Sequence, residues 1–401
     1  MKIIQYCQHV LGIGHLFRSL EICRALCDHE VILVTGGPRV ATDLPEHVRE
    51  VRLPDLQMNR EFKGLFSSRK NAGLDQIKEE RQKRLFGLFE REKPDVFLIE
   101  LYPFGRKAFR FELDPVLQAV DDKRLPCGLV VCSVRDILVE KEDRDKHESR
   151  VVKTLNGYFN AVLVHADPQL ANISETLDHF DLIAIPVDYT GYITPKPSPD
   201  AGKRIRKQWK IGENEILIIA SAGGGNVGAP ILESVLRAFG RLGMKSRCHL
   251  KVFTGPFLDQ NDFDRLTKSA GNNVQVTRFT TDFLSYLAAA DLSVSMGGYN
   301  TTMNILSTGV PALVWPFPQN REQRLRAGRL ADMGALRVLE DEDLHPDRLA
   351  VIMDQWISRS TRPTVNINLN GAANTAKWVE NQIKAQPLRH EGRRWLKKRP
   401  I

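Results

Sequence analysis

A glycine pair followed by helix-starting residues is the part of this sequence best suited to chemistry. A short apolar run leads to Gly297 and Gly298, and Asn300 and Thr301 then favour the start of a helix that Gly309 would end. The first amides of a helix have no partner within it, and its dipole favours negative charge at that end. Glycine also lets the backbone approach a phosphate more closely than a residue with a Cβ does. The stretch therefore predicts an anion pocket suited to a phosphate group.

Polar side chains farther along the chain are expected near the same place. Asn304 lies one turn after Asn300, so the two amides share a face of the expected helix. A buried strand is expected at 312–316, and Gln323 follows it at the start of the next helix. Parallel strands end at one edge of a sheet, where open α/β sheets bind ligands, so these side chains should converge there. The alternative is an ordinary strand-turn-helix unit without a ligand.

A second glycine loop has the same setting. The segment 221–228, SAGGGNVG, follows a predicted strand and precedes a predicted helix, with Gly224, Gly225 and Asn226 at its centre. Such a loop alone is a weak signal. Together with the first turn it would give one domain two helix N-termini, which could frame a nucleotide base and a diphosphate.

A histidine near the N-terminus is the candidate base. Gly12, Gly14, His15 and Arg18 form the pattern G-x-G-H-x-x-R between a predicted strand and a predicted helix, at the carboxyl edge of the expected first sheet. An imidazole with a pKa near neutrality suits a group that takes a proton from an attacking hydroxyl. Arg18, one turn farther on, could bind an acceptor phosphate. The alternative is a histidine with a structural role. The pattern differs from G-x-G-x-x-G, so it does not indicate an NAD site.

Two aspartates at the ends of predicted strands are rival bases. Asp136 ends SVRD and Asp167 lies in HADP. We count Asp136 with His15 as a candidate catalytic residue. For both aspartates the alternative is a carboxylate that caps a helix.

Alternating strands and helices must position these residues. Short apolar runs bounded by polar residues occur at 2–8, 30–35, 95–100, 128–132 and 161–164, and again at 215–220, 249–254, 274–279, 292–295 and 312–315. Helical stretches separate them, which predicts parallel sheets with helices on both faces. The proline- and glycine-rich segment between the two sets is the expected linker.

The segments GGYNTTMNIL and GVPALVWPFP, with the downstream glutamine and its RA pair, resemble the donor-sugar motif of MurG-like glycosyltransferases. The resemblance runs from about 215 to 337, and in the first half it depends mainly on G-x-G-H-x-x-R, which is also similar to the motif of related nucleotide-sugar hydrolases. It implies the α/β GT-B fold, in which two Rossmann-like, doubly wound parallel-sheet domains face a cleft. The implied parts are an acceptor-side domain at 1–187, a linker at 188–204, a nucleotide-sugar-binding domain at 205–368, a helix at 369–386 that crosses back to the first domain, and a basic tail at 387–401.

The same resemblance implies roles for particular residues. Asn226 aligns with a serine that lies near the phosphates, and Gln323 matches a glutamine that contacts the donor sugar. His15 matches the proposed base of the related hydrolases. Asn304 stands where the family has a glutamate that binds the ribose hydroxyls. This departure exchanges a charge-assisted hydrogen bond for a neutral one, typically about half as strong.

Composition indicates a soluble globular protein. The 401 residues are 42% hydrophobic and 26% charged, and no apolar run reaches the ~18 residues of a membrane span. The chain begins directly with a strand-like segment and shows no secretory signal. Its six cysteines occur singly, without CxxC pairs, so buried apolar roles are expected. These features predict a cytoplasmic protein.

The net charge of +8 is concentrated at the C-terminus. Residues 389–399 contain six basic residues and one acidic residue. They form either a solvated tail or a segment attracted to the inner face of an anionic membrane. No nucleic-acid partner is expected, because no RNA- or DNA-binding motif accompanies the charge.

No metal or other cofactor is expected. The acidic clusters lie in polar, helix-like or loop contexts and not after buried strands. In the fold that the resemblance implies, helix termini and basic side chains stabilise the leaving diphosphate instead.

These expectations describe a metal-independent, inverting glycosyltransferase. It would move a sugar, such as an N-acetylhexosamine, from a UDP-sugar to a lipid-linked or small hydroxyl acceptor. Two alternatives stay open: a nucleotide-sugar hydrolase of the same fold, and a non-catalytic nucleotide-sugar-binding regulator in which Asn304 records lost catalysis. The epimerase branch of the fold is disfavoured because its motif is richer in acids than GGYNTT.

Overall fold

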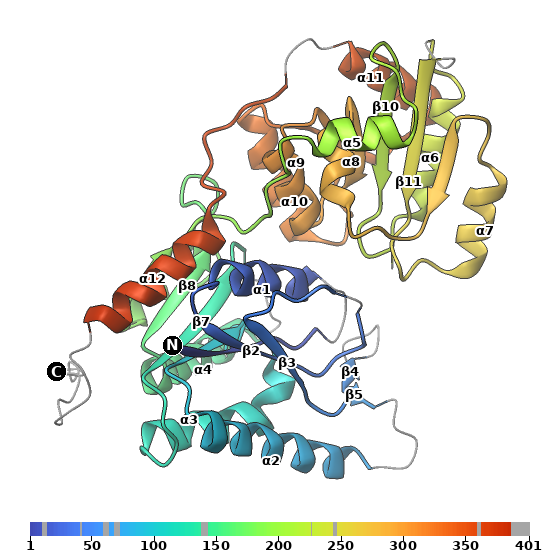
Figure 1. Cartoon of the computed structure of the whole chain (residues 1–401). Helices are drawn as coiled ribbons and strands as arrows, with labels where there is room; N and C mark the ends of the chain where they lie inside the picture. The colour runs from blue at the N-terminus through green and yellow to red at the C-terminus, as the bar shows by residue number, and fades with distance from the viewer. Residues whose placement is uncertain are drawn as a thin grey trace.

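A computed structural model describes residues 1–9, 14–40, 42–58, 64–67, 73–137, 143–225, 227–243, 247–358 and 362–385. These residues form two α/β domains that lie one above the other in Figure 1. The basic tail, Gly12 and Asn226 lie outside the described residues. Within the described part of the chain, no helix is long and apolar enough to cross a membrane.

The N-terminal domain is built on a seven-stranded sheet in which every neighbouring pair is parallel. The strand order is β3 (Val48–Arg52), β2 (Glu30–Thr35), β1 (Lys2–Tyr6), β6 (Val96–Glu100), β7 (Leu129–Arg135), β8 (Ala161–His165) and β9 (Val187–Tyr189). The central strands β6, β7 and β8 are buried except for the last residue of β7, which explains why they read as continuous apolar runs. A small antiparallel pair, β4 (Gln57–Met58) and β5 (Leu65–Phe66), lies apart from this sheet.

Helices cover both faces of this first sheet. Ile3 packs with residues of α1 (Gly14–Ala25) on one face. Ile4, its neighbour, packs on the other face with residues of α2 (Leu74–Glu92), α3 (Arg110–Asp121) and α4 (Arg144–Tyr158). Successive strand residues thus point to opposite faces, and both faces are apolar.

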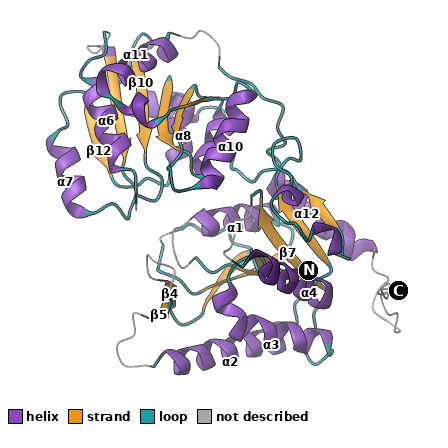
Figure 2. Cartoon of the chain, turned by 180° about the vertical axis from the view of Figure 1, so that it is seen from behind, coloured by secondary structure: helices purple, strands orange, loops and turns teal. Residues whose placement is uncertain are grey.

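The C-terminal domain repeats this plan with a six-stranded parallel sheet. Its order is β12 (Val274–Thr277), β11 (Cys248–Phe253), β10 (Ile216–Ser221), β13 (Leu292–Met296), β14 (Ala312–Trp315) and β15 (Arg337–Val338). One face packs against α6 (Ala229–Phe239), α7 (Gln260–Lys268) and α11 (Pro346–Ile357). The other packs against α5 (Ala201–Gln208), α8 (Phe283–Ala289), α9 (Tyr299–Thr308) and α10 (Arg321–Asp332). Figure 2 shows the strands of each domain lying among their helices. The predicted fold class, two doubly wound parallel-sheet domains, is confirmed.

The chain passes between the domains twice. The linker follows β9, which carries Asp188 and Tyr189 into the first sheet, so the linker begins later than the expected residue 188. The second passage leads from α11 to α12 (Gly371–Ala385), which lies against the N-terminal domain in Figure 1. The two passages lie side by side: Tyr192 N donates to Asn368 O at 2.7 Å, and Gly371 N donates to Tyr192 O at 2.9 Å.

The helix α12 belongs to the core of the N-terminal domain although it ends the described chain. Ala376 and Val379 pack in the same apolar cluster as Leu20 of α1. Trp378 Nε1 donates a hydrogen bond to the Asp188 carboxylate at 2.8 Å.

Candidate functional site

Each sheet reverses the direction of its helical crossovers once, and His15 and the two glycine turns lie at these two points. In the first sheet the reversal lies between β1 and β6; His15 follows β1 and Glu100 ends β6. In the second it lies between β10 and β13, which lead to the two glycine turns. Open α/β sheets bind ligands in the crevice at such switch points.

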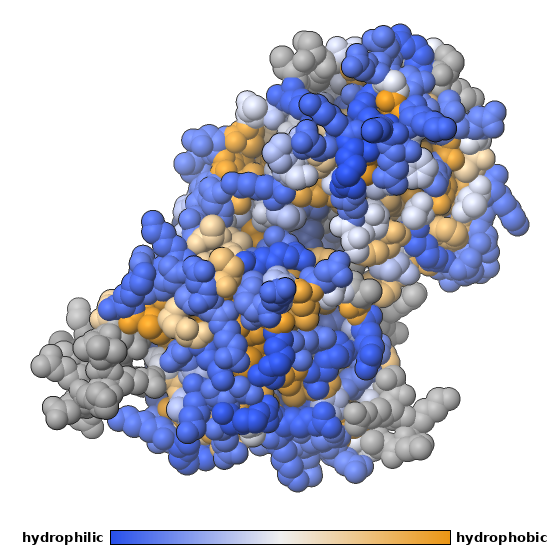
Figure 3. All heavy atoms as spheres, in the orientation of Figure 1, coloured by the Kyte–Doolittle hydropathy of each residue, from blue (hydrophilic) through white to orange (hydrophobic). Residues whose placement is uncertain are grey.

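The two switch points meet across the domain boundary. Asn300 Nδ2, in the first turn of α9, donates to the carbonyl of Gly14 in the first turn of α1 at 3.3 Å. A Cβ added to Gly14 would lie 3.3 Å from the same amide nitrogen, so the contact leaves little room for a side chain there. The space-filling view shows the surface hollowed where the two domains meet (Figure 3). His15 therefore lies one residue from the contact between the candidate acceptor and donor sides.

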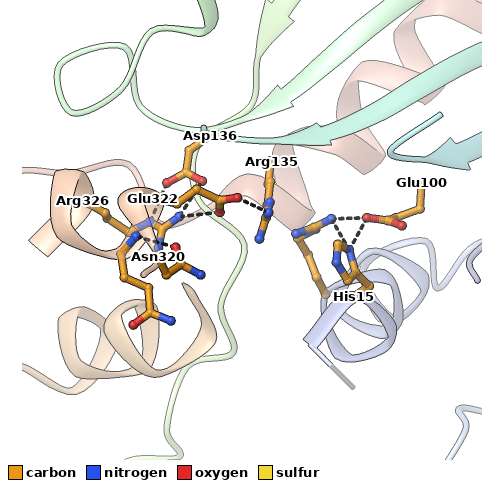
Figure 4. A network of polar contacts seen from close by, with 9 residues as sticks. His15, Glu100, Arg135, Asp136, Asn320, Glu322 and Arg326 are labelled. Atoms are coloured by element: carbon orange, nitrogen blue, oxygen red, sulfur yellow. Dashed lines mark hydrogen bonds and ion pairs between the residues drawn. The ribbon is translucent and has the colours of Figure 1, made fainter. Parts of the chain in front are cut away.

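His15 is held by a buried carboxylate that the sequence analysis did not identify. Its Nδ1 lies 2.6 Å from Glu100 Oε1, and Figure 4 shows the two side chains pointing toward each other. Burial alone would raise the pKa of Glu100, but His15, Arg106 and Arg18 hold it well below its usual range. Glu100 is therefore ionised and can only accept a hydrogen bond, so Nδ1 of His15 carries the proton. Arg18 Nη2, 3.5 Å from the same Nδ1, donates to Glu100 instead.

In the tautomer with the proton on Nδ1, Nε2 of His15 is unprotonated and keeps its lone pair. Burial lowers the pKa of His15 to about 4, although the Glu100 charge opposes this shift. The imidazole is thus neutral at pH 7, and about one fifth of its side chain is exposed. Such a histidine, with Nδ1 fixed by a carboxylate, offers the Nε2 lone pair to the proton of a hydroxyl. Its lowered pKa differs from the near-neutral value expected from the sequence, because burial disfavours the charged imidazolium.

Arg18 lies deeper than the sequence suggests. It is almost fully buried, and its Nη2 donates to Glu100 Oε1 at 2.5 Å. Its guanidinium also lies over the Tyr299 ring of the other domain, with Cζ 5.6 Å from the ring centre. Its role in binding an acceptor phosphate stays a prediction.

Asp136 joins the two domains. Both of its oxygens accept hydrogen bonds from Arg326 of α10, from Nε at 2.6 Å and from Nη2 at 3.0 Å, and neither residue has more than 1% of its side chain exposed (Figure 4). Burial alone would raise the pKa of Asp136, but Arg326 holds it below its usual value. A carboxylate with both oxygens occupied and no exposed surface is placed to hold the domains together. In this arrangement both oxygens are engaged by Arg326, and the catalytic role of Asp136 stays a prediction.

Other contacts cross the boundary beside this ion pair. Arg135 Nη2 donates to Glu322 of α10 at 2.6 Å. Tyr299 Oη donates to the carbonyl of His165, and its ring lies 5.2 Å from Cζ of Arg326. The rival aspartate Asp167 instead accepts from two backbone amides, those of Gln169 and Asn368, at 2.9 Å each, as a structural turn residue does.

The N-terminus of α9 has free amides. Thr302 N bonds to Gly298 O, but the amides of Gly298, Tyr299, Asn300 and Thr301 have no hydrogen-bond partner among the described residues, and no side chain caps the helix. A Cβ added to Gly298 would meet nothing closer than Thr301 Oγ1 at 3.9 Å. The turn thus combines open space with unpaired donors, as an anion pocket requires.

The second glycine loop reaches the same point. A Cβ added to Gly223 would also lie 3.9 Å from Thr301 Oγ1, so this hydroxyl lies between the two turns. Gly224 faces open space, with nothing within 4 Å of an added Cβ. Gly225 is packed: its φ is +88° and an added Cβ would lie 2.5 Å from Thr254 O. Gly297 is packed as well, against Val314 and Gln323.

Two predicted donor residues are partly engaged within the protein. Asn304 Oδ1 accepts from Thr194 Oγ1 of the linker at 3.0 Å. Gln323 Oε1 accepts from Phe317 N at 3.0 Å, so its Nε2 group keeps its two donors for another partner. The side chain of Asn320 caps α10 by accepting a hydrogen bond from Gln323 N. Because this amide is already paired, the N-terminus of α10 is less suited to an anion than that of α9. The donor roles of Asn304 and Gln323 stay predictions.

The structure brings together residues that the sequence analysis missed. Glu100, Arg106, Arg135 and Arg326 surround the predicted histidine and aspartate. Glu100 ends a buried strand in DVFLIE, so the rule that functional groups follow parallel strands could have identified it. The partners of Asp136 and Arg135 lie almost 190 residues away, and no local pattern carries that information.

Within the described residues, no cluster of three or more histidine, cysteine, aspartate or glutamate side chains could hold a metal ion. Among the described residues at the two switch points, backbone amides of α9 and arginines such as Arg18 can stabilise negative charge.

Two facing domains of this kind, with helix N-termini at both switch points, define the GT-B class, and comparisons with known proteins agree. Residues 220–381 match the family model of the glycosyltransferase family 28 C-terminal domain. The structure of a kitacinnamycin glycotransferase is similar with a TM-score of 0.61 and 19% identity, covering 95% of this chain and 98% of that one. The structure of the MurG of Acinetobacter baumannii is similar with a TM-score of 0.54 and 15% identity, covering 96% of this chain and 99% of that one.

A curated relative points to the same group. UDP-N-acetylglucosamine--N-acetylmuramyl-(pentapeptide) pyrophosphoryl-undecaprenol N-acetylglucosamine transferase of Paraburkholderia xenovorans is 29% identical over 222 residues, which is 53% of this chain. The matched part of the chain spans 55% of the length of this relative, or about half. It spans 30% of the length of a second curated relative, an uncharacterized glycosyltransferase of Methanosarcina mazei. The resemblance to MurG-like GT-B glycosyltransferases that the motifs indicate is confirmed.

Proposed function

We propose that this protein is a glycosyltransferase that moves a sugar from a nucleotide-sugar donor, held by the C-terminal domain, to a hydroxyl acceptor on the N-terminal domain. One observation carries the proposal: the contact between Asn300 and Gly14 places the candidate base beside the free amides of α9. The candidate base and the candidate anion pocket lie on different domains, so a bound donor and a bound acceptor would meet between them.

The donor side would bind the diphosphate without a metal cation. The unpaired amides of α9 and the dipole of that helix would receive the diphosphate, and the open positions at Gly224 and Gly298 allow close approach. Preorganised donors of this kind stabilise the charge that develops on a leaving diphosphate. The relative named above uses UDP-N-acetylglucosamine, which supports a UDP-linked N-acetylhexosamine as donor here.

On the acceptor side, His15 would act as the general base. As the acceptor oxygen forms a bond to the anomeric carbon, its proton passes to Nε2 of His15. The bond between the anomeric carbon and the diphosphate oxygen breaks, and the nucleoside diphosphate leaves with the electron pair. Glu100 holds the imidazole in this tautomer and stabilises the imidazolium that forms. Attack opposite the leaving group inverts the anomeric carbon. As the acceptor we propose a lipid-linked or small compound that carries a hydroxyl group.

The first experiment tests the donor site. UDP should raise the melting temperature of the wild-type protein, and Gly298→Ala should abolish that increase while the melting temperature without UDP stays unchanged. Gly298 has φ −62°, which alanine adopts readily, and the new methyl group would fill only open space. Gly271→Ala is the matched control, because nothing lies within 4 Å of its added Cβ and it lies before β12, away from the switch point. A Gly298→Ala variant that binds UDP like the wild type would remove α9 as the diphosphate site.

The second experiment tests the reaction. UDP-sugars are incubated with the protein with and without lipid-linked or polyol acceptors, and UDP release is measured. Release that requires the acceptor supports sugar transfer. Release of equal rate without it indicates a nucleotide-sugar hydrolase, and binding without release under every condition indicates a regulator.

A further inference from the structure

Tyr299 belongs to the turn of the candidate donor pocket, but its side chain contacts the other domain. It is the first residue of α9 and follows the glycine pair directly, and its side chain is largely buried, with 9% of the residue exposed. Its hydroxyl donates to His165 O of the N-terminal domain at 3.3 Å and accepts from Ile193 N of the linker at 3.4 Å. One residue thus carries a backbone amide of the donor side and a side chain that reaches the acceptor side.

Two guanidinium groups contact the ring of Tyr299. Cζ of Arg18, on α1 of the N-terminal domain, lies 5.6 Å from the ring centre, and Cζ of Arg326, on α10, lies 5.2 Å from it. A cation is attracted to an aromatic face, and more strongly when both are shielded from water. Here 3% of the Arg18 side chain and 1% of the Arg326 side chain are exposed. The ring therefore connects one buried charge of each domain.

Arg18 connects this ring to the candidate base. Its Nη2 donates to Glu100 Oε1 at 2.5 Å, and the same oxygen lies 2.6 Å from Nδ1 of His15 (Figure 4). The orientation of the imidazole depends on the position of the Glu100 carboxylate, and that carboxylate is bonded to the guanidinium that contacts the Tyr299 ring. A continuous series of contacts thus leads from the first residue of α9 to His15.

Resting on the proposed function, we infer that Tyr299 is a positioning residue for sugar transfer. Its ring holds the Arg18 guanidinium in place, and through Arg18 and Glu100 it fixes the imidazole of His15 opposite the N-terminus of α9. Because Tyr299 is part of α9, the base is aligned with the helix that would hold the leaving diphosphate. A misplacement of about 1 Å at a reacting group can cost about a hundredfold in rate, so this alignment should affect kcat.

Substitutions at position 299 test the role of the ring in the transfer assay described above. Tyr299→Leu removes the ring but keeps the backbone amides of α9, so it should lower kcat by about 10- to 100-fold and leave UDP affinity and the KM for the donor little changed. Tyr299→Phe keeps the ring and loses only the two long hydrogen bonds of the hydroxyl, so it should retain most of the wild-type kcat. If Tyr299→Leu fails to fold, Tyr299→Met replaces it, because an unbranched side chain fits irregular gaps.

Tyr286→Leu is the matched control. Tyr286 of α8 is 8% exposed, close to the value of Tyr299, but its ring contacts Phe253 and its hydroxyl accepts from Trp209 of the same domain. Its loss should lower the melting temperature without lowering kcat.

A double variant separates positioning from a general loss of structure. If Tyr299 acts through Glu100, adding Tyr299→Leu to Glu100→Gln should cause little further loss of kcat, because the series of contacts to His15 is already broken. Losses that multiply would show that the ring acts independently of Glu100.

The NMR resonance of the Nδ1 proton of His15 provides a readout that requires no activity. A proton shared with a carboxylate appears far downfield, and its loss in Glu100→Gln assigns it. The resonance should shift or broaden in Tyr299→Leu and stay unchanged in Tyr299→Phe and Tyr286→Leu.

Wild-type kcat in Tyr299→Leu, multiplying losses in the double variant, or an unchanged Nδ1 resonance in Tyr299→Leu would each overturn the proposal. Absence of sugar transfer in the wild-type protein would count against the proposed function instead. The resonance would then still decide whether Tyr299 positions His15.

Discussion

Replacing Asp136 with asparagine tests how the two domains are held together. The change keeps the shape of the side chain and removes the charge opposite Arg326. The guanidinium would keep Glu322, 4.0 Å away, and the Tyr299 ring as its remaining partners. Only 1% of the Arg326 side chain is exposed, so water cannot reach it while the domains stay in contact.

The expected cost follows from this burial. Breaking a buried ion pair by removing one partner costs about 3–5 kcal/mol, because the remaining charge is desolvated. Arg326 can regain water if the domains separate, so the cost should appear as a shift toward a separated arrangement. Since 1.4 kcal/mol is a tenfold change, the ratio of closed to separated molecules should fall by between about a hundredfold and a few thousandfold.

Small-angle scattering and thermal unfolding measure the two parts of this effect. Asp136→Asn should increase the radius of gyration or lower the melting temperature, and the double variant Asp136→Leu with Arg326→Met should recover most of the loss, because apolar replacements leave no buried charge. Asp178→Asn is the control: that carboxylate is 66% exposed in its pair with Arg144, and such pairs contribute about 0–1 kcal/mol.

The same variants decide whether Asp136 is a base. If it is structural, sugar transfer should return in the double variant together with the closed shape. Unchanged shape and stability in Asp136→Asn would refute the structural reasoning, and a closed but inactive double variant would support a catalytic role for Asp136.

Two further predictions concern the buried titratable groups. Glu100→Gln should lower kcat/KM by about 10²- to 10⁴-fold and leave UDP affinity unchanged, because Glu100 contacts only the N-terminal domain; full activity would show that His15 needs no carboxylate partner. Burial lowers the pKa of His15 to about 4 and that of His165 to about 3, so between pH 6.5 and 4 the unfolded chain binds protons that the folded one does not. The free energy of unfolding should therefore decrease on acidification through this window, by up to about 1.4 kcal/mol per pH unit for each histidine. His165→Gln should reduce the slope of denaturant-derived stability against pH, and an unchanged slope would contradict the assignment.

The fold could be predicted because its strands are buried on both faces. Runs such as Asp95–Glu100 and Ala161–Val164 are continuous apolar segments between polar ones, and their alternation with helices specifies a parallel sheet. The boundary between the N-terminal domain and the linker, which lies after β9, was harder to predict from this pattern. Its residues Val187–Tyr189 are only partly buried, so the edge strand has no clear apolar pattern.

The candidate site could be predicted only where one local segment contains its chemistry. The turn at Gly297 and Gly298 and the histidine after β1 are such segments. The ion pair between Asp136 and Arg326 is different, because it exists only after two domains have folded and met. From the sequence, Asp136 is expected at the end of a strand, where catalytic groups often lie. Its surroundings depend on the guanidinium of Arg326, which lies 190 residues farther along the chain.

The paired passages between the domains constrain how the molecule can move. Ile193 of the linker and Asn370 before α12 form an antiparallel bridge, and a Cβ on Gly371 would lie 2.1 Å from Gly191 O, so the two segments form one narrow ribbon. The two connecting segments are therefore tied to each other and not independent tethers. Any separation of α1 from α9 would have to bend both segments together at this ribbon, whose backbones lie too close for a side chain at position 371.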